Sequence, residues 1–524
     1  MRKNSKIIII IYFFVLLCIG LSIFRDYGVH WDEYNNQSLG NKWRKYISDV
    51  INEQSVTTVL TSLHEEHDWI HGPAFEIFLN FIQNKFFNPD ESRNIIFIRH
   101  LCTFLLFYIS IYFFYLLCQI HFKSWKISLF ASAFLILSPR IFADSFYNTV
   151  DMPFFSFYII SIYTLLRWLD KKTFPRAIAH AFSCAFLIDI RIVGITVPFY
   201  TLVLLIPDII RTTEYKERMK TCKTVLVYFL LLIVLIILFW PLLWDNTLSK
   251  LIKLAKVMND VHWSDTCLYL GKYITAKNLP WHYAPVWIMI TTPIFYSLCF
   301  FVGFFISITP FSRNPIISAF NKRNNLLFAL WLFVPLIATH GRLYDGWRHI
   351  YFVYPAFLMF SAMGLVAIWE FIKHKFKNNI CKFMCGLIIL VTLLSMGNVI
   401  YFMVKYHPYQ NIYFNRLAGK NMEKIKKTFE MDYWGLSYRK ALEFILENDN
   451  NKTIKVFVEN VPGKNTANIL TNNYKERLVY VDTPGEAKYF LSNYRWHPEE
   501  YPYHQEYFSI KIDDAKIMVV YKLQ

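Results

Sequence analysis

Repeated apolar runs, each about as long as the hydrocarbon core of a bilayer is thick, constrain the fold of this chain more than any other feature. A helix crosses that core, which is roughly 30 Å thick, with about 20 apolar residues. About eleven such runs can be drawn along the chain, at residues 7–24, 94–118, 127–143, 154–168, 177–190, 193–208, 224–241, 286–308, 325–339, 350–371 and 383–403. Only 18% of the 524 residues are charged, against about 25% in soluble domains. The sequence therefore predicts a mainly α, polytopic membrane helix bundle and excludes a soluble multidomain enzyme.

Basic residues set the expected orientation of this bundle. Arg2, Lys3 and Lys6 precede the first run and no small-residue cleavage site follows it, so we expect a retained first helix with a cytoplasmic amino terminus. Every cytoplasmic turn is then rich in Lys and Arg, at 123–126, 167–176, 211–223, 313–323 and 373–382. Topology thus accounts for the net charge of +17 without nucleic acid as a partner. We expect a multi-pass protein of the cell (inner) membrane, surrounded by membrane lipids.

The segments expected outside the cytoplasm are of two kinds. The long loops at 25–93 and 242–285 alternate apolar and polar residues in stretches that suit helices lying in the membrane interface, at Trp43–Val50, Pro73–Phe87 and Leu248–Val261. The polar tail has a helical pattern at Leu436–Glu447 and strand patterns at Lys455–Glu459, Arg477–Asp482, Tyr507–Ile512 and Ile517–Tyr521. We therefore predict a transmembrane domain at 1–403 and a small non-cytoplasmic α/β domain at 404–524.

Two adjacent carboxylates follow the first apolar run directly. Asp32 and Glu33 stand within Arg25–Asn36, where the chain is expected to leave the membrane. A carboxylate at this place suits a general base acting on a substrate that arrives from water while its partner lies in lipid. An ordinary solvated loop is the alternative that spacing alone leaves open.

A second polar cluster lies further along the same loop, at His64–Pro73 (HEEHDWIHGP). His and carboxylate ligands could surround zinc or manganese, but this order lacks the paired histidines of an HExxH helix. The nine cysteines lie mostly within or beside apolar runs, with neither disulfide-ladder spacing nor His partners. We therefore expect an interfacial polar cluster, no disulfide framework and no metal cofactor, with a divalent metal as the open alternative.

Ionisable side chains also mark the short outer loops, where positive charge is usually scarce. The candidates are Arg140, Asp144, Asp151, Asp189, Arg191, Arg342, Arg348 and His349. Such groups near the membrane are costly and favour a function, and the arginine fork matches phosphate oxygens. The alternatives are snorkelling of Arg140 to the surface, an ion pair between Asp189 and Arg191, and headgroup anchoring by the last loop. An aromatic group at the start of another span suits either an interfacial belt or a sugar platform, at Trp281, His282 and Tyr283.

With these residues in view, the chain resembles the bacterial members of the dolichyl-phosphate-mannose protein mannosyltransferase superfamily, glycosyltransferase family 39, which have the GT-C fold. The order of the motifs carries the resemblance, at His30–Glu33, His71–Pro73, Ser138–Arg140, Asn148–Pro153, Leu279–Pro285, Asp345–His349 and Phe429–Ser437. It implies a polyprenyl-phosphate sugar as donor, an active site on the non-cytoplasmic face and a catalytic acid in the first outer loop. By position that acid is Asp32 or Glu33, with Asp32 preferred. Related aminoarabinose transferases often have a Lys near the position of His71, which leaves the identity of the phosphate-contacting residue open.

Together these observations predict an inverting membrane glycosyltransferase that moves a sugar to an acceptor hydroxyl of a protein, glycan or lipid. The donor phosphate would be held by Arg348, His349, Arg342, His71, Arg140 and Arg191, and the substrate would contact Asp151, His282, Tyr283 and Trp281. The main alternative is a transporter or flippase of lipid-linked sugars, which would show broken helices in matching halves and charges near the midplane. A non-catalytic structural protein does not explain the adjacent carboxylates, and an O-antigen ligase or polymerase should use a diphosphate donor.

Overall fold

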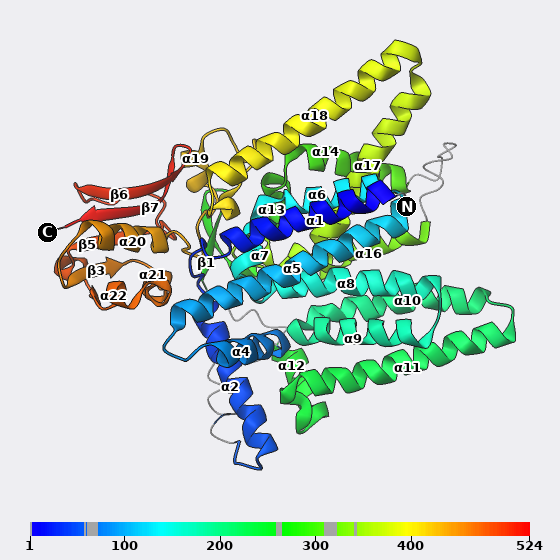
Figure 1. Cartoon of the computed structure of the whole chain (residues 1–524), viewed down its shortest axis with the longest axis horizontal. Helices are drawn as coiled ribbons and strands as arrows, with labels where there is room; N and C mark the ends of the chain where they lie inside the picture. Colours follow the sequence, from blue (N-terminus) through cyan, green and yellow to red (C-terminus); the bar gives the residue numbers. More distant parts are fainter. Residues whose placement is uncertain are drawn as a thin grey trace.

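The protein is a bundle of long helices with a small sheet domain at one end (Figure 1). The computed structural model describes residues 3–56, 59, 72–257, 265–308, 322–339 and 343–523. The amino terminus lies at the end of the bundle opposite the carboxyl-terminal sheet (Figure 1).

The chain is a multi-pass membrane protein. Among the described residues, seven helical segments are long and apolar enough to cross a membrane, or eight if the bent pair α6 and α7 is one span. They are formed by α1 (Lys3–Ile23), α5 (Ser92–Phe122), α8 (Asp151–Asp170), η1 (Ile192–Ile195) with α10 (Thr196–Arg211), α11 (Tyr215–Phe239), η4 (Arg348–Val353) with α17 (Tyr354–Lys375), and α18 (Asn378–Lys405).

The remaining predicted runs also overlap helices, but these are shorter or broken. The two halves of the pair α6 (Trp125–Ile136) and α7 (Pro139–Tyr147) meet at 70°, and α13 (Tyr283–Thr291) is separated from α14 (Ile294–Ile308) at Pro293. Proline cannot donate a helical hydrogen bond and disfavours a helical residue before it, so it starts a new helix in both places. The helices α9 (Phe174–Ile190) and α16 (Lys322–Ala338) have 17 residues each.

The two long loops contain helices at the three predicted places. These are α2 (Glu33–Ile51), α4 (Ala74–Phe86) and α12 (Thr247–Val257). The second loop also includes the short helices η2 (Pro241–Trp244) and η3 (Ala276–Asn278) and an antiparallel hairpin of β1 (Thr266–Tyr269) and β2 (Lys272–Thr275), which the sequence analysis did not anticipate.

The C-terminal sheet domain has one main helix packed on a five-stranded sheet with strand order β4-β3-β5-β7-β6. Its strands are β3 (Ile454–Val458), β4 (Leu478–Tyr480), β5 (Tyr489–Ser492), β6 (Glu506–Ile512) and β7 (Ala515–Lys522), and its main helix is α20 (Tyr438–Asn448). Shorter helices are η5 (Gln410–Ile412), α19 (Met422–Lys426), α21 (Pro462–Asn465), η6 (Thr466–Ile469), α22 (Asn472–Lys475) and η7 (Pro484–Glu486). One apolar face of α20 packs on β3, β5 and β7 to form a core of its own.

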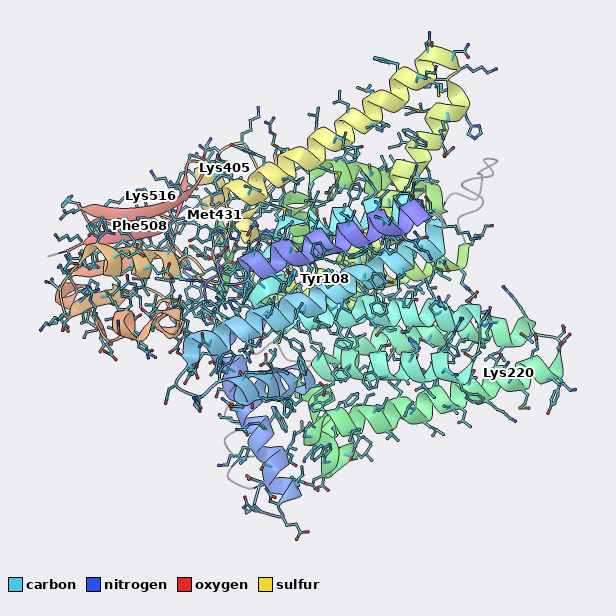
Figure 2. The ribbon with its side chains drawn as sticks, in the orientation of Figure 1. Tyr108, Lys220, Lys405, Met431, Phe508 and Lys516 are labelled. Carbon is cyan, nitrogen blue, oxygen red and sulfur yellow. The ribbon has the colours of Figure 1, made fainter. Side chains whose placement is uncertain are left out.

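The basic turns and the sheet domain occupy opposite ends of the bundle. Lys220, in the first two turns of α11, lies at the end where the chain begins, whereas Lys516 lies in the sheet domain (Figure 2). This is the separation that the positive-inside rule requires if the sheet domain is outside the cytoplasm.

Cysteine labelling tests that orientation. Single cysteines at the exposed positions Lys171 and Lys464, in a background without the native cysteines, should react with a membrane-impermeant thiol reagent from opposite sides. Position 464 should react in intact cells, and position 171 only after the membrane is opened. Reaction of both positions from one side would contradict the predicted topology.

Candidate active site

A half-buried carboxylate and a buried guanidinium meet where the loop after α1 passes the start of η4. Asp32 is the residue before α2, and its side chain is 32% exposed. Its carboxylate lies 3.6 Å from Nη2 of Arg348, the first residue of η4. The backbone N–H of Asp32 donates to Nδ1 of His30 at 3.1 Å, which fixes the local path of the chain. The structure therefore brings together two residues that sequence analysis placed in different roles.

Asp151 joins this pair to a second arginine. It is the first residue of α8, and its carboxylate oxygens lie 2.6 Å from Nη2 of Arg191 and 3.1 Å from Nη1 of Arg348. Asp189 does not pair with Arg191. Its side chain instead accepts a hydrogen bond from the backbone N–H of Ala74 at 2.8 Å. Arg191 therefore belongs to the ionic cluster around Asp151.

Glu33 has a different environment from its neighbour Asp32. Its side chain is buried and lies 3.0 Å from Nε of Arg99 in α5, 3.2 Å from His30 and 3.5 Å from His100. Burial opposes ionisation of Glu33, but hydrogen bonds from His100 and His30 outweigh it and hold the pKa of Glu33 well below its usual range. Arg99 is shared with Glu76 at 2.8 Å. Glu33 is thus an ionised anchor between α2 and α5, and Asp32 alone of the two faces Arg348.

Three predicted phosphate-binding arginines keep an unused donor. Among the described residues, Nε of Arg348, Nε of Arg191 and Nη2 of Arg140 are buried without a hydrogen-bond partner. Arg140 contacts other groups than Asp151. Its Nε donates to the carbonyl oxygen of Tyr413 at 3.2 Å, and its guanidinium lies 5.1 Å from the ring centroid of Trp287. Buried donors without acceptors are rare in proteins. Each of the three arginines therefore has a donor that the described protein groups do not use.

The other predicted site residues are distributed around this centre. Tyr283 accepts a hydrogen bond from the backbone N–H of Gly346 at 2.9 Å, so it supports the loop before Arg348. His282 bonds the hydroxyl of Tyr269 at 2.6 Å. Trp281 is 74% exposed and does not reach the centre. The ring of His349 packs on Tyr344 with centroids 4.4 Å apart. His71, Arg342 and the polar cluster at 64–68 lie outside the described residues.

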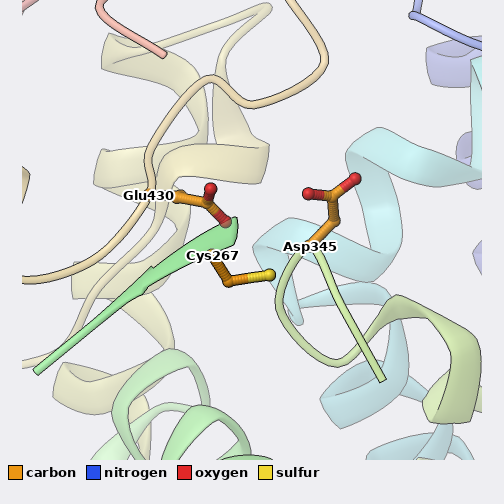
Figure 3. Close-up of side chains that lie close together, drawn as sticks. All are labelled: Cys267, Asp345 and Glu430. Atoms are coloured by element: carbon orange, nitrogen blue, oxygen red, sulfur yellow. The ribbon is translucent and has the colours of Figure 1, made fainter. Parts of the chain in front are cut away.

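Sequence analysis missed a second group of ionisable side chains beside Arg348. Cys267 of β1, Asp345 and Glu430 turn toward one another from three separate segments (Figure 3), with one ligand atom of each within 4.8 Å of the others. Burial and the charge of Asp345 raise the pKa of Glu430 to about 8, against the effect of Arg495. A group of this kind could hold a metal ion, but Arg495 already forms an ion pair with Asp345 at 2.9 Å. These residues are far apart in sequence, so no spacing pattern could have revealed them.

Comparison with known proteins agrees with this architecture. Residues 84–244 match the family model described as dolichyl-phosphate-mannose-protein mannosyltransferase. The apo crystal structure of ArnT from Cupriavidus metallidurans aligns with a TM-score of 0.51 at 10% identity, over 99% of this chain and 98% of that chain. The chain therefore has the GT-C fold of that protein, and its residues 84–244 are similar to the mannosyltransferase family.

A second crystal structure and the curated proteins were also compared with the chain. The crystal structure of the same ArnT bound to undecaprenyl phosphate aligns with a TM-score of 0.47, again at 10% identity and over 99% of this chain and 98% of that chain. No curated protein matches the sequence. The region that matches the family model includes Arg140, Asp151 and Arg191, whereas Asp32 and Arg348 lie on either side of it.

Proposed function

We propose that this protein is an inverting glycosyltransferase that moves a sugar from a polyprenyl-phosphate donor to an acceptor hydroxyl on the non-cytoplasmic face of the membrane. One observation carries the proposal: the half-buried carboxylate of Asp32 lies 3.6 Å from Arg348, and Arg348 and Arg191 both keep an unused buried donor. The match of residues 84–244 to a glycosyltransferase family supports the class of reaction.

In the proposed reaction Asp32 removes the proton of the acceptor hydroxyl. The oxygen forms a bond to the anomeric carbon on the face opposite the phosphate, the bond from that carbon to the phosphate oxygen breaks, and polyprenyl phosphate leaves with the electron pair. A phosphate monoester is already a good leaving group, so one base and cations that hold the phosphate charge are sufficient. Attack from the opposite face inverts the anomeric configuration.

Arg348 and Arg191 would hold the donor phosphate. Both already share the carboxylate of Asp151, at 3.1 and 2.6 Å, which fixes their guanidinium groups before the donor arrives. A preorganised cation needs little rearrangement when the leaving group develops charge. Asp151 is therefore an orienting group in this proposal, and Arg140 is a further donor nearer the aromatic side chains of Trp287 and Phe414.

The position of the charges favours transfer over transport. Transporters bind their substrates near the bilayer midplane, between repeats with broken helices. Here Asp345 lies 3.8 Å from Arg348 and pairs with Arg495 of the sheet domain, so the ionic cluster lies at the end of the bundle that carries the sheet domain.

A donor panel tests the proposed function directly. Purified protein in lipid nanodiscs should release polyprenyl phosphate from one polyprenyl-phosphate sugar in a panel, and should do so faster when an acceptor is present. Turnover should persist in EDTA, because arginines supply the positive charge at the phosphate. Release from diphosphate donors only, or movement of the intact lipid-linked sugar across a vesicle membrane without cleavage, would contradict the proposal.

A further inference from the structure

Arg495 connects the C-terminal sheet domain to the proposed active site. It lies in the loop between β5 and β6, and the residue is only 7% exposed. Its Nη2 donates to Asp345 at 2.9 Å, and its Nη1 donates to the carbonyl oxygen of Tyr433. A charge buried at the junction of two domains is costly unless it is paired in this way.

The same guanidinium packs on the residue before the proposed base. Its central carbon lies 4.7 Å from the ring centroid of Trp31 and 4.5 Å from that of Trp496. The two indole rings meet edge to face at 5.8 Å. Trp496 is itself held by a hydrogen bond from its Nε1 to the carbonyl oxygen of Thr266 at 2.9 Å. Arg495 therefore fixes Trp31, and with it the start of α2 at Asp32, against the sheet domain.

Asp345 extends the contact to the proposed phosphate arginine. One of its carboxylate oxygens pairs with Arg495, and the other lies 3.8 Å from Nη2 of Arg348. A single side chain of the sheet domain thus borders both halves of the site, the base through Trp31 and the phosphate arginine through Asp345.

The backbone on both sides of Arg495 adopts a conformation that aromatic residues rarely accept. Tyr494 and Trp496 have φ values of +59° and +60°. Left-handed backbone is unfavourable for bulky residues and persists where surrounding contacts require it, often at functional sites. The loop is therefore shaped to direct Arg495 toward the membrane domain.

A second C-terminal segment, around Trp434 and Leu436, also packs against the loop that contains Trp31. Trp434 stacks on His30 with centroids 4.7 Å apart and an interplanar angle of 28°, and its ring lies 5.0 Å from the guanidinium carbon of Arg348. A Cβ at Gly28 would lie 2.3 Å from the carbonyl oxygen of Leu436, so only glycine permits this approach. The first outer loop is thus enclosed by C-terminal residues over several positions.

We propose that Arg495 is a positioning residue, through which the C-terminal sheet domain holds Asp32 and Arg348 in the geometry for transfer. The catalytic consequence rests on the proposed function, whereas the structural consequence does not. Removing Arg495 should release the loop at Trp31 and the loop at Asp345 together, because its guanidinium contacts both Trp31 and Asp345.

Hydrogen exchange measured by mass spectrometry tests the structural part without reference to activity. In the full-length Arg495→Gln variant, amides at 29–34 and 343–348 should exchange several-fold faster than in the wild type, while β3, β5 and β7 keep their protection. Arg477→Gln is the matched control: within the described part of the chain, Arg477 donates to carbonyl oxygens of the sheet domain, those of Asn451, Leu446 and Asp449. Its effect should stay within that domain. Unchanged exchange at 29–34 and 343–348 in Arg495→Gln would overturn the inference, and so would a general loosening of residues 404–523.

Steady-state kinetics tests the catalytic part. Misplacing a reacting group by about 1 Å can cost roughly 100-fold in rate, so Arg495→Gln should lower kcat roughly 10- to 100-fold. The donor KM should change much less, because Arg348 remains bound to Asp151. Arg495→Lys should recover part of kcat, since an ammonium group can still pair with Asp345 and pack on Trp31, while Arg477→Gln should keep wild-type kcat.

The two experiments separate this inference from the proposed function. If the wild-type protein is inactive with every donor, the proposed function fails and the exchange data still decide whether Arg495 holds the two loops. If the wild type is active and Arg495→Gln has the kcat of Arg477→Gln, the positioning role fails while the transfer activity stands.

Discussion

Asp32→Asn is expected to lower turnover by a factor of about 10² to 10⁴, the range that a general base contributes. The substitution keeps the size of the side chain and most of its hydrogen bonding, and it removes the negative charge and with it the ability to take the acceptor proton. Because Asp32 is 32% exposed and its contact to Arg348 is long, at 3.6 Å, the variant should still insert, fold and bind the donor. Rates of sugar transfer and equilibrium binding of the lipid donor, measured on the same preparation, check both halves of the expectation.

Two neighbouring carboxylates provide the controls. Asp26 lies in the same loop and pairs with His407 at 2.8 Å, away from Arg348, so Asp26→Asn should leave turnover near the wild-type value. Glu33→Gln removes an anchor of Arg99 and should lower thermal stability more than it lowers turnover, since breaking a buried ion pair is strongly destabilising. Turnover near the wild-type level in Asp32→Asn would reject Asp32 as the base. A collapse of turnover in a well-folded Glu33→Gln, with Asp32→Asn unaffected, would assign that role to Glu33.

Much of the membrane fold follows from hydropathy alone, and its departures have local causes. Every predicted apolar run overlaps a helix, because length and apolarity are what the bilayer requires. The breaks at Pro139 and Pro293 do not change the hydropathy of their runs, so a window average joins helices that the backbone separates.

The strands β1, β2 and β5, which the sequence did not predict, have weak local sequence patterns. The hairpin of β1 and β2 turns at Leu270 and Gly271, both with positive φ, whereas the usual sequence signal for such a turn is Asn-Gly or Asp-Gly. Strand β5 has only four residues, all buried. A fully buried strand shows none of the period-two alternation by which strands are recognised.

The sequence predicted several residues of the candidate site but not which of them form ion pairs with one another. Unusual charge near the membrane identified Asp151, Arg191 and Arg348, but proximity suggested that Arg191 pairs with Asp189. In the structure Arg191 instead pairs with Asp151. The difference between Asp32 and Glu33 arises from helix geometry: adjacent residues at the start of α2 face different directions, one toward Arg348 and one toward Arg99. That direction is a property of the packed bundle, which the sequence does not display locally.

Arg348→Ala should weaken donor binding by about 10- to 150-fold, which corresponds to the roughly 1.5 to 3 kcal/mol that a hydrogen bond to a charged group contributes. Arg348 shares Asp151 with Arg191, and its buried Nε has no hydrogen-bond partner among the described residues. The phosphate of the lipid-linked sugar would accept a hydrogen bond from this nitrogen. The loss should fall on binding of the lipid phosphate and less on folding, because Asp151 keeps Arg191 at 2.6 Å and does not become an unpaired buried charge.

An arginine paired at the other end of α8, the helix that Asp151 begins, provides a matched control. Arg176 pairs with Asp170 at 3.1 Å, the distance that also joins Arg348 to Asp151. Asp151 is the first residue of α8 and Asp170 is its last. At a rise of 1.5 Å per residue, the two ion pairs are therefore roughly 28 Å apart. Arg176→Ala therefore removes an arginine paired to the same helix and should leave donor affinity unchanged. Titration of both variants with a polyprenyl-phosphate sugar, alongside their thermal unfolding, separates a lost phosphate contact from a weakened fold. Wild-type affinity in a well-folded Arg348→Ala would move the phosphate site away from η4, toward Arg140 and its aromatic neighbours.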